Sequence, residues 1–200
     1  MARVDDSAQR SAANALMERY ASGDDSAFGE LYDYVAPRLY SFLLRQTRDQ
    51  ARAEDLVQQT LLQMHCARRH FAPGAEVVPW AFAIGRRLMI DGIRKRKHEV
   101  QMSTDEGTSE RESTAPPMLR PDAQLASKEL AGRIQDELAR LPEQNRIAFE
   151  LVKQEGLSMA EAAEVLGTTV AAVKLRAHRS YEALRSALGD VIDVEHGGPP

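Results

Sequence analysis

Two stretches of the chain concentrate the positive charge that binding to a polyanion requires. The first, residues 86–97, holds six cations against the single acid Asp91: Arg86, Arg87, Arg94, Lys95, Arg96 and Lys97. The second, residues 174–185, has Glu182 as its only acid and contains Lys174, Arg176, His178, Arg179 and Arg185. Lysine and arginine at this density neutralise phosphates, and Trp80, ahead of the first stretch, offers a ring on which an unpaired base can stack. Both stretches therefore predict nucleic-acid contacts. Cations near a helix C-terminus also complement the helix dipole, and partial burial in the core is the more common role for a tryptophan such as Trp80.

The residue types and motifs of the sequence do not favour metal binding or catalysis. Cys66 and His70 lie one helical turn apart beside His65, but the chain has 1 cysteine and its other histidines fall in other predicted elements. We expect an ordinary helix surface there, with no metal and no cofactor. The sequence has no glycine-rich phosphate loop, nucleophile elbow or paired-carboxylate pattern, so we do not expect an enzyme.

The composition is that of a soluble protein of one or two small domains, with 43% hydrophobic and 28% charged residues among 200. Because the formal net charge is −4, the distribution of charge is more informative than its total. Residues 101–124 are rich in Ser, Thr, Glu, Gly and Pro and predict a flexible acidic linker. The single cysteine fits a reducing compartment, and neither a membrane-spanning run nor a signal-peptide core occurs. We expect a cytoplasmic protein without direct membrane insertion.

Residues 156–185 have the pattern of a helix-turn-helix. Ser158 with Glu161 three residues on fits a capping box, and Gly167 suits the left-handed residue that ends the helix. Thr169 caps the second helix. Its inner stripe, at spacings of four, three and four, is Val173, Ala177, Ser180 and Leu184. The cations occupy the opposite face, as in a DNA-reading helix, although a helical hairpin with a solvated basic face has the same pattern.

A long amphipathic helix is predicted from Ala51 to about His70. Its inward stripe is Ala53, Leu56, Val57, Thr60, Leu61 and Met64. Its outward stripe is Asp55, Gln58, Gln59 and Leu62. An amide pair with an outward leucine suits docking on another helix better than solvation, which favours Lys and Glu. A solvated face with one stray leucine remains the alternative.

Signals for helix starts and breaks complete an all-α prediction. Residues 1–10 should fray before a short helix from Ala12 to Tyr20, and Asp24 or Asp25 should cap the next helix. Pro37 and Pro79 should each stand in the first turn of a helix, the second running from Trp80 to about Lys97, and Pro73-Gly74 should break the chain before it. Helices from Leu125 to Leu141 and behind Pro142 precede the helix-turn-helix. The fold is therefore two small helical domains, 10–100 and 125–188, joined by the linker and followed by a disordered tail at 189–200.

Several of these motifs, taken in order, resemble a bacterial RNA polymerase sigma factor of the extracytoplasmic-function (ECF, group IV, sigma-70 family) type. AEDLVQQTLLQM at 53–64 resembles region 2.2, and VPWAFAIGRRLMIDGIRKR at 78–96 resembles regions 2.3 and 2.4. LPEQNRIAFELV at 141–152 resembles region 4.1, and the helix-turn-helix follows as region 4.2. The resemblance covers nearly the whole chain, and the predicted linker lies where members of the family have a linker.

The resemblance implies a polymerase subunit that directs promoter-specific initiation. Asp55, Gln58, Gln59 and Leu62 would dock on the clamp helices of the largest polymerase subunit, and the polymerase flap would be a further contact. The loop Phe71–Val78 and the helix behind it would open and hold the −10 element, with Trp80, Arg86, Arg87, Arg94, Lys95 and Arg96 as DNA-binding residues. Lys174, Leu175, Arg176, His178 and Arg179 would face the −35 element. An anti-sigma partner is expected from the family alone.

Four positions depart from the family's usual pattern. Arg87 stands where Asn is common, and Gly85 replaces a usual Ala, which should loosen its helix by roughly 1 kcal/mol. Ala162 is smaller than the usual Ile, and Leu175 is apolar where a polar reader is common. Two other classes remain as alternatives: a sigma-mimicking adaptor that binds an anti-sigma protein without DNA, and an ordinary helix-turn-helix repressor. The adaptor would be expected to lack the basic helices, and the repressor would leave residues 51–97 unexplained.

Overall fold

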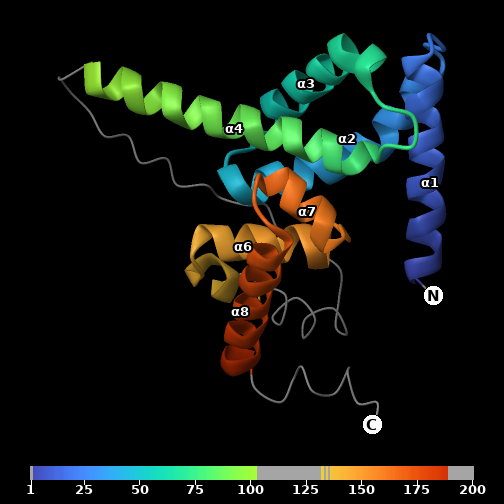
Figure 1. Ribbon diagram of the computed structural model, residues 1–200. Helices are drawn as coiled ribbons and strands as arrows, with labels where there is room; N and C mark the ends of the chain where they lie inside the picture. Colours follow the sequence, from blue (N-terminus) through green and yellow to red (C-terminus); the bar gives the residue numbers. More distant parts are fainter. Residues whose placement is uncertain (1, 103–131, 133, 135, 189–200) are drawn as a thin grey trace, which may run out of the picture. The chain divides into compact units, whose positions relative to one another are not determined.

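The computed structural model describes residues 2–102, 132, 134 and 136–188, and every regular element in these ranges is helical (Figure 1). The predicted all-α class is therefore confirmed. The chain divides into two compact units, Met1–Ser113 and Thr114–Pro200. The tail predicted at 189–200 lies outside the described residues, as does the predicted linker beyond Met102.

The first unit is a bundle of four α-helices and a short turn. These elements are α1 (Ala2–Ala21), α2 (Ala27–Thr47), α3 (Gln50–Ala67), a 3-10 turn (Arg68–His70) and α4 (Val77–Met102). The six residues predicted to face inward from α3 are all buried, which confirms that stripe. Phe82, on α4, is fully buried with its ring centroid 5.1 Å from that of Phe42 on α2. Apolar burial against α2 and α3 therefore positions the helix that carries the first group of cations.

Two predictions about where helices of this unit begin are wrong. Residues 2–10 continue α1 and do not fray, because no Gly or Pro interrupts this stretch and Ala13, Met17 and Tyr20 anchor the helix in the core. Pro37 does not begin a helix but lies inside α2. An interior proline costs a helix about 3 kcal/mol, whereas each large apolar side chain that α2 buries contributes about 1.5–3 kcal/mol. Burial of the α2 side chains on both sides of Pro37 therefore outweighs the lost hydrogen bond.

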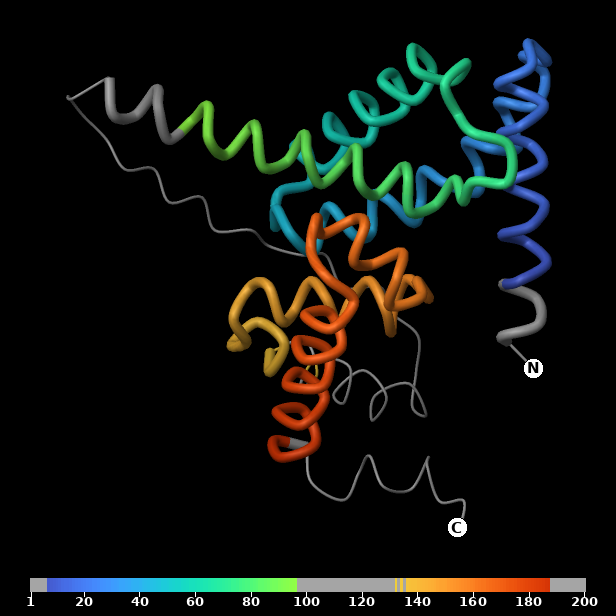
Figure 2. The backbone as a smooth tube through the Cα atoms, in the orientation of Figure 1, coloured from blue at the N-terminus to red at the C-terminus, as the bar shows by residue number. Residues whose placement is uncertain are grey.

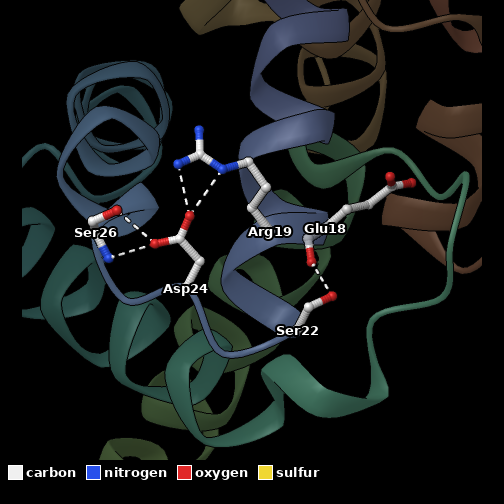
Figure 3. A network of polar contacts seen from close by, with 5 residues as sticks. All are labelled: Glu18, Arg19, Ser22, Asp24 and Ser26. Carbon is white, nitrogen blue, oxygen red and sulfur yellow. Dashed lines mark hydrogen bonds and ion pairs between the residues drawn. The ribbon is translucent and has the colours of Figure 1, made fainter.

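Asp24 organises the turn between α1 and α2 (Figure 3). One of its carboxylate oxygens accepts from the Ser26 backbone N–H at 3.1 Å and also from the Ser26 hydroxyl. The other accepts from Arg19 Nε and Nη2, at 2.9 and 2.7 Å. These contacts, the Ser26 hydroxyl first, hold the pKa of the Asp24 carboxyl below its usual value. The N-cap of α2 is Ser26, which has no side-chain capping bond, so the predicted cap by Asp24 or Asp25 is also wrong; Asp24 instead binds the N-cap residue itself.

The second unit contains the predicted helix-turn-helix. Its helices are α6 (Glu143–Phe149), a π-helical turn (Glu150–Gln154), α7 (Met159–Leu166) and α8 (Val170–Leu188). Ahead of α6, the described residues 132, 134 and 136–140 are helical, as predicted, and Leu138 packs on Leu184 of α8. The π turn was not predicted. It encloses Glu150, which is 1% exposed and lies 3.9 Å from the Arg146 guanidinium.

Local hydrogen bonds fix the helix-turn-helix as expected. Ser158 Oγ accepts from the Glu161 backbone N–H at 3.2 Å, and the Glu161 carboxylate accepts from the Ser158 N–H at 2.6 Å. Gly167 ends α7 at φ 60°, and Thr169 Oγ1 accepts from the Ala172 N–H at 3.2 Å. The inner stripe of α8 is buried throughout, and Ala162 is completely enclosed despite its small size. The capping box, the glycine turn and the inner stripe are therefore confirmed.

Candidate nucleic-acid interface

The cations of α4 lie mainly on its exposed surface. Arg87, Arg94, Lys95 and Arg96 are exposed, whereas Arg86 and Trp80 are half-buried. The Trp80 ring packs on Phe71, with ring centroids 5.2 Å apart, so part of the indole surface is covered within the first unit. Asp91 approaches Arg94 only to 4.0 Å at an exposed position, where an ion pair contributes little. Phosphates can therefore approach Arg87, Arg94, Lys95 and Arg96 from solvent.

Gln63 of α3 orients Arg87, a contact that the sequence did not reveal. Arg87 Nη2 donates to Gln63 Oε1 at 2.8 Å. Guanidinium has no acceptor, so the amide oxygen must face Arg87 and the amide NH2 points elsewhere. One guanidinium N–H is used in this bond, and the others stay available to a phosphate or a base. Gln63 directly follows the outward stripe of α3, but only the packing of α3 on α4 could have identified it.

Gly85 brings α3 and α4 close together next to this contact. A Cβ at Gly85 would lie 3.0 Å from Leu39 Cδ1 and 3.2 Å from Thr60 Oγ1, closer than packed atoms normally come. The glycine predicted to loosen its helix is therefore also a point of close packing. It allows α4 to approach both α2 and α3.

The outward stripe of α3 is exposed as predicted. Asp55, Gln58, Gln59 and Leu62 are all exposed, and Leu62 retains 62% of its accessible surface. Gln59 Nε2 donates to Asp55 Oδ2 at 2.8 Å, which orders two polar side chains of the stripe. An apolar side chain so open to water, next to ordered polar groups, is typical of a protein-binding surface.

A groove between α2 and α3 adjoins this stripe. Its volume is about 360 Å³, and its lining is Tyr32, Asp33, Ala36, Pro37, Tyr40, Glu54, Val57 and Gln58. Gln58 belongs to both the groove and the stripe. The groove therefore extends the exposed surface of α3 onto α2.

Three polar residues of α1 hold the segment between the 3-10 turn and α4, a second feature that the sequence reading missed. Asn14 Oδ1 accepts from the Val77 N–H at 2.9 Å, and Glu18 Oε1 accepts from the Gly74 N–H at 2.8 Å. Arg10 Nη2 pairs with Glu76 at 3.4 Å. The spacing of four residues between these α1 side chains was visible in the sequence, but their partners were not.

The outer face of α8 carries the second group of cations. Lys174, Leu175, His178 and Arg179 are exposed, and Arg176 is half-buried. The Ser180 hydroxyl contacts the backbone oxygens of Asn145 and Arg176 at 2.9 and 3.0 Å, which ties α8 to α6. The helix therefore offers one apolar and four polar or basic side chains from a fixed axis, as insertion in a major groove requires.

The histidine and cysteine cluster does not come together as a metal site in the structure. His65 Nδ1 is hydrogen-bonded to the Tyr20 hydroxyl, and the Arg68 guanidinium lies 5.5 Å from the centroid of the Tyr20 ring. Burial raises the pKa of the Tyr20 phenol. Across the described ranges, no group of three or more His, Cys, Asp or Glu side chains has an arrangement that could hold a metal ion. No helix among the same residues is long and apolar enough to cross a membrane.

Comparison with family models matches each unit separately. Residues 31–99 match "Sigma-70 region 2", and residues 131–184 match "Sigma-70, region 4". The first range includes α3 and most of α4, and the second includes the helix-turn-helix.

Individual proteins match over most of the chain. The RNA polymerase sigma factor CarQ of Myxococcus xanthus is 35% identical over 88% of this chain and 97% of its own length. The ECF RNA polymerase sigma factor SigW of Bacillus subtilis is 28% identical over 88% of this chain and 96% of its own. Among solved structures, the sigma factor RpoE in complex with the anti-sigma factor NepR from Bartonella quintana has a TM-score of 0.64 at 27% identity, covering 80% of this chain and 96% of that one.

Proposed function

The chain belongs to the sigma-70 family, in its ECF group, and we propose on this basis which of its surfaces carry out each step of initiation. It is a sigma factor, which binds core RNA polymerase and directs promoter-specific transcription initiation. The observation that supports our assignment is that each unit presents its own exposed basic helix, α4 in region 2 and α8 in region 4.

The outward stripe of α3 is the surface for core polymerase. Asp55, Gln58, Gln59 and Leu62 dock on the clamp helices of the largest subunit, with Leu62 as the apolar anchor, and region 4 contacts the flap. Burial of an exposed leucine contributes about 1.5–3 kcal/mol, and its polar neighbours fix the register.

The basic face of α4 and the loop at residues 71–76, the −10 loop, open and hold the −10 element. Extrusion of a base from duplex DNA costs a few kcal/mol in stacking and pairing. Contacts of Arg87, Arg94, Lys95 and Arg96 with the backbone of the unpaired strand offset this cost, with Arg86 and Trp80 closer to the body of the unit. Region 2 therefore stabilises the open strand and has no covalent chemistry to perform, so the protein acts without enzymatic activity.

The outer face of α8 reads the −35 element in the major groove. Arg176 and Arg179 suit bidentate contacts with guanine edges, whereas Lys174 and His178 suit phosphates or single edge contacts. Leu175 suits the methyl group of a thymine.

We also propose an anti-sigma partner that controls access to these surfaces, because the similar RpoE was solved with one. A factor that binds core polymerase works where the polymerase is, and we therefore place the protein in the cytoplasm. The helix-turn-helix keeps its caps, its buried inner stripe and its exposed basic face. These features favour a DNA-binding factor over an adaptor that has lost DNA contacts.

Transcription with purified core polymerase on a genomic DNA library tests the assignment. The protein should associate stably with core polymerase and enrich transcripts from promoters that share −10 and −35 elements. An adaptor would give no promoter preference, and a repressor would bind DNA without associating with the polymerase; either result would refute the proposal.

A further inference from the structure

Polar residues along one side of α1 make two contacts with the −10 loop and one with the first residue of α4. Arg10, Asn14 and Glu18 are spaced by four residues, so they lie on one stripe of the helix. They contact Glu76, the Val77 N–H and the Gly74 N–H respectively. Figures 1 and 2 both show the segment between α3 and α4 running alongside α1. The contacts therefore cover the −10 loop from its glycine to the start of α4.

The −10 loop has few hydrogen bonds of its own with which to keep this shape. Pro73 has no backbone N–H. Within the loop, the Ala75 N–H donates to the Ala72 oxygen at 3.0 Å, and Gly74 has φ 76°. The Val77 N–H is a first-turn amide of α4, which has no partner in its own helix, and Asn14 supplies the missing acceptor from another helix. The side chains of α1 thus supply hydrogen bonds that the loop does not make internally.

The stripe itself is held rigidly against the unit. Ala13, Met17 and Tyr20, on the adjacent face of α1, are buried in the core. The loop is also fixed at its other end, where the Phe71 ring packs on Trp80. A loop held at both ends presents one conformation to a nucleotide, so less ordering entropy is lost when DNA binds.

We propose that α1 is a positioning element for promoter opening, in which Arg10, Asn14 and Glu18 set the conformation of the −10 loop that contacts the extruded strand. The inference rests on the proposed function of that loop. It gives a role to a helix that precedes the residues 31–99 matched to region 2. No residue of the stripe needs to touch DNA, because each acts through the loop.

Three variants of the full-length protein test the proposal. The first is R10A/N14A/E18A, which removes all three contacts. The second, N14D/E18Q, keeps an acceptor oxygen at both hydrogen-bonding positions. The third, Q9A/S11A, is a matched control that truncates two exposed polar side chains elsewhere on α1. Each is assembled with core polymerase and assayed for core affinity, thermal melting and open-complex formation on a promoter recovered from the genomic library, and on the same promoter with single-base changes in its −10 element.

The triple-alanine variant should open the promoter about tenfold more slowly than the wild type, the cost of ordering a loop that is no longer held. It should also discriminate less between the promoter and its −10 variants, while its core affinity is unchanged. N14D/E18Q and Q9A/S11A should match the wild type in both respects, even if the triple variant melts earlier.

Unchanged opening and discrimination in the triple-alanine variant would overturn the inference, as would a loss that N14D/E18Q shares. A parallel loss of core affinity would also overturn it, since α1 would then act through docking. If the wild-type holoenzyme shows no promoter preference, the proposed function itself fails and the inference fails with it. If the wild type opens the promoter and the triple-alanine variant opens it equally well, the inference is refuted while the proposed function stands.

Discussion

The two basic helices of this sigma factor present similar side chains but are positioned in different ways. α8 is fixed by its own neighbours in sequence, through the Ser158 capping box, the Gly167 turn and the Thr169 cap. α4 is fixed by residues far away in the sequence. Gln63 holds Arg87, Asn14 caps Val77, and Gly85 lies against Leu39 and Thr60.

The difference suggests a division between reading and opening. A duplex −35 element can be read by a helix whose axis is set locally, since the DNA itself is regular. An extruded strand is less regular, and the surface that we propose binds it is held in place by contacts among α1, α3 and α4. Damage to the packing of the first unit should therefore impair opening, whereas region 4 should tolerate surface changes without loss of its fold.

Charge reversal on α4 should have the largest effect. In R87E/R94E, attraction of the open strand is replaced by repulsion at two exposed positions, so permanganate-detected opening should fall at least about 100-fold while core binding persists. R48E, at an exposed arginine on the turn between α2 and α3, is the control. Arg86 is left intact because it is half-buried, and a reversed charge there would also disturb the fold. Unchanged opening in R87E/R94E would place the −10 contact on another surface.

Removal of two cations from α8 should weaken −35 binding. It should not affect transcription from a template whose −10 element is already open. R176A/R179A should lose about 10- to 100-fold in affinity for −35 duplex DNA. The slope of log K against log salt should become shallower by about 1 for each of the two arginines that contacts a phosphate, whereas contact with a guanine edge adds to the loss of affinity without this change in slope. K153A, at an exposed lysine of the π turn, should change neither quantity. Unaltered affinity together with an unaltered salt slope in the double variant would show that α8 does not face the DNA.

Paired glycine substitutions compare close packing with helix propensity. G85A should destabilise the first unit by about 1–2 kcal/mol, because overpacking against Leu39 and Thr60 exceeds the gain of about 1 kcal/mol in helix propensity. G29A, in the open first turn of α2, should stabilise the same unit by up to about 1 kcal/mol, since nothing lies within 4 Å of its Cβ position. Urea denaturation followed by the fluorescence of Trp80 measures both. A stabilising G85A would show that α4 is not closely packed there.

Loss of the capping box should have the smallest effect. S158A should lower the stability of region 4 by about 1 kcal/mol, and S158G by a few tenths. Trp80, the 1 tryptophan of the chain, reports on the first unit, so its unfolding transition should not move while the loss of helical circular dichroism shifts. A shift of both transitions would contradict local fixation of α8.

The sequence predicted what depends on neighbours along the chain. The inner stripes of α3 and α8, the Ser158 box and the Gly167 turn all follow from helical spacing and cap chemistry, and the structure confirms them. Pro37 inside α2, the close packing at Gly85 and the Gln63–Arg87 bond did not follow. Each depends on which helix packs where, and local propensity does not encode this. The roles of the exposed residues remain predictions.

The lowered pKa of Asp24 determines how the junction of the first two helices responds to acid. Its carboxyl is more acidic in the folded state than its ordinary value of 3.8, so the contribution of this group is complete above that value and disappears only as the pH falls through the lowered pKa. Fluctuations near neutrality leave the carboxylate ionised and its bonds to Arg19 and Ser26 intact. The bonds that Asp24 makes at the bend between α1 and α2 therefore persist at every pH above the ordinary value of its carboxyl.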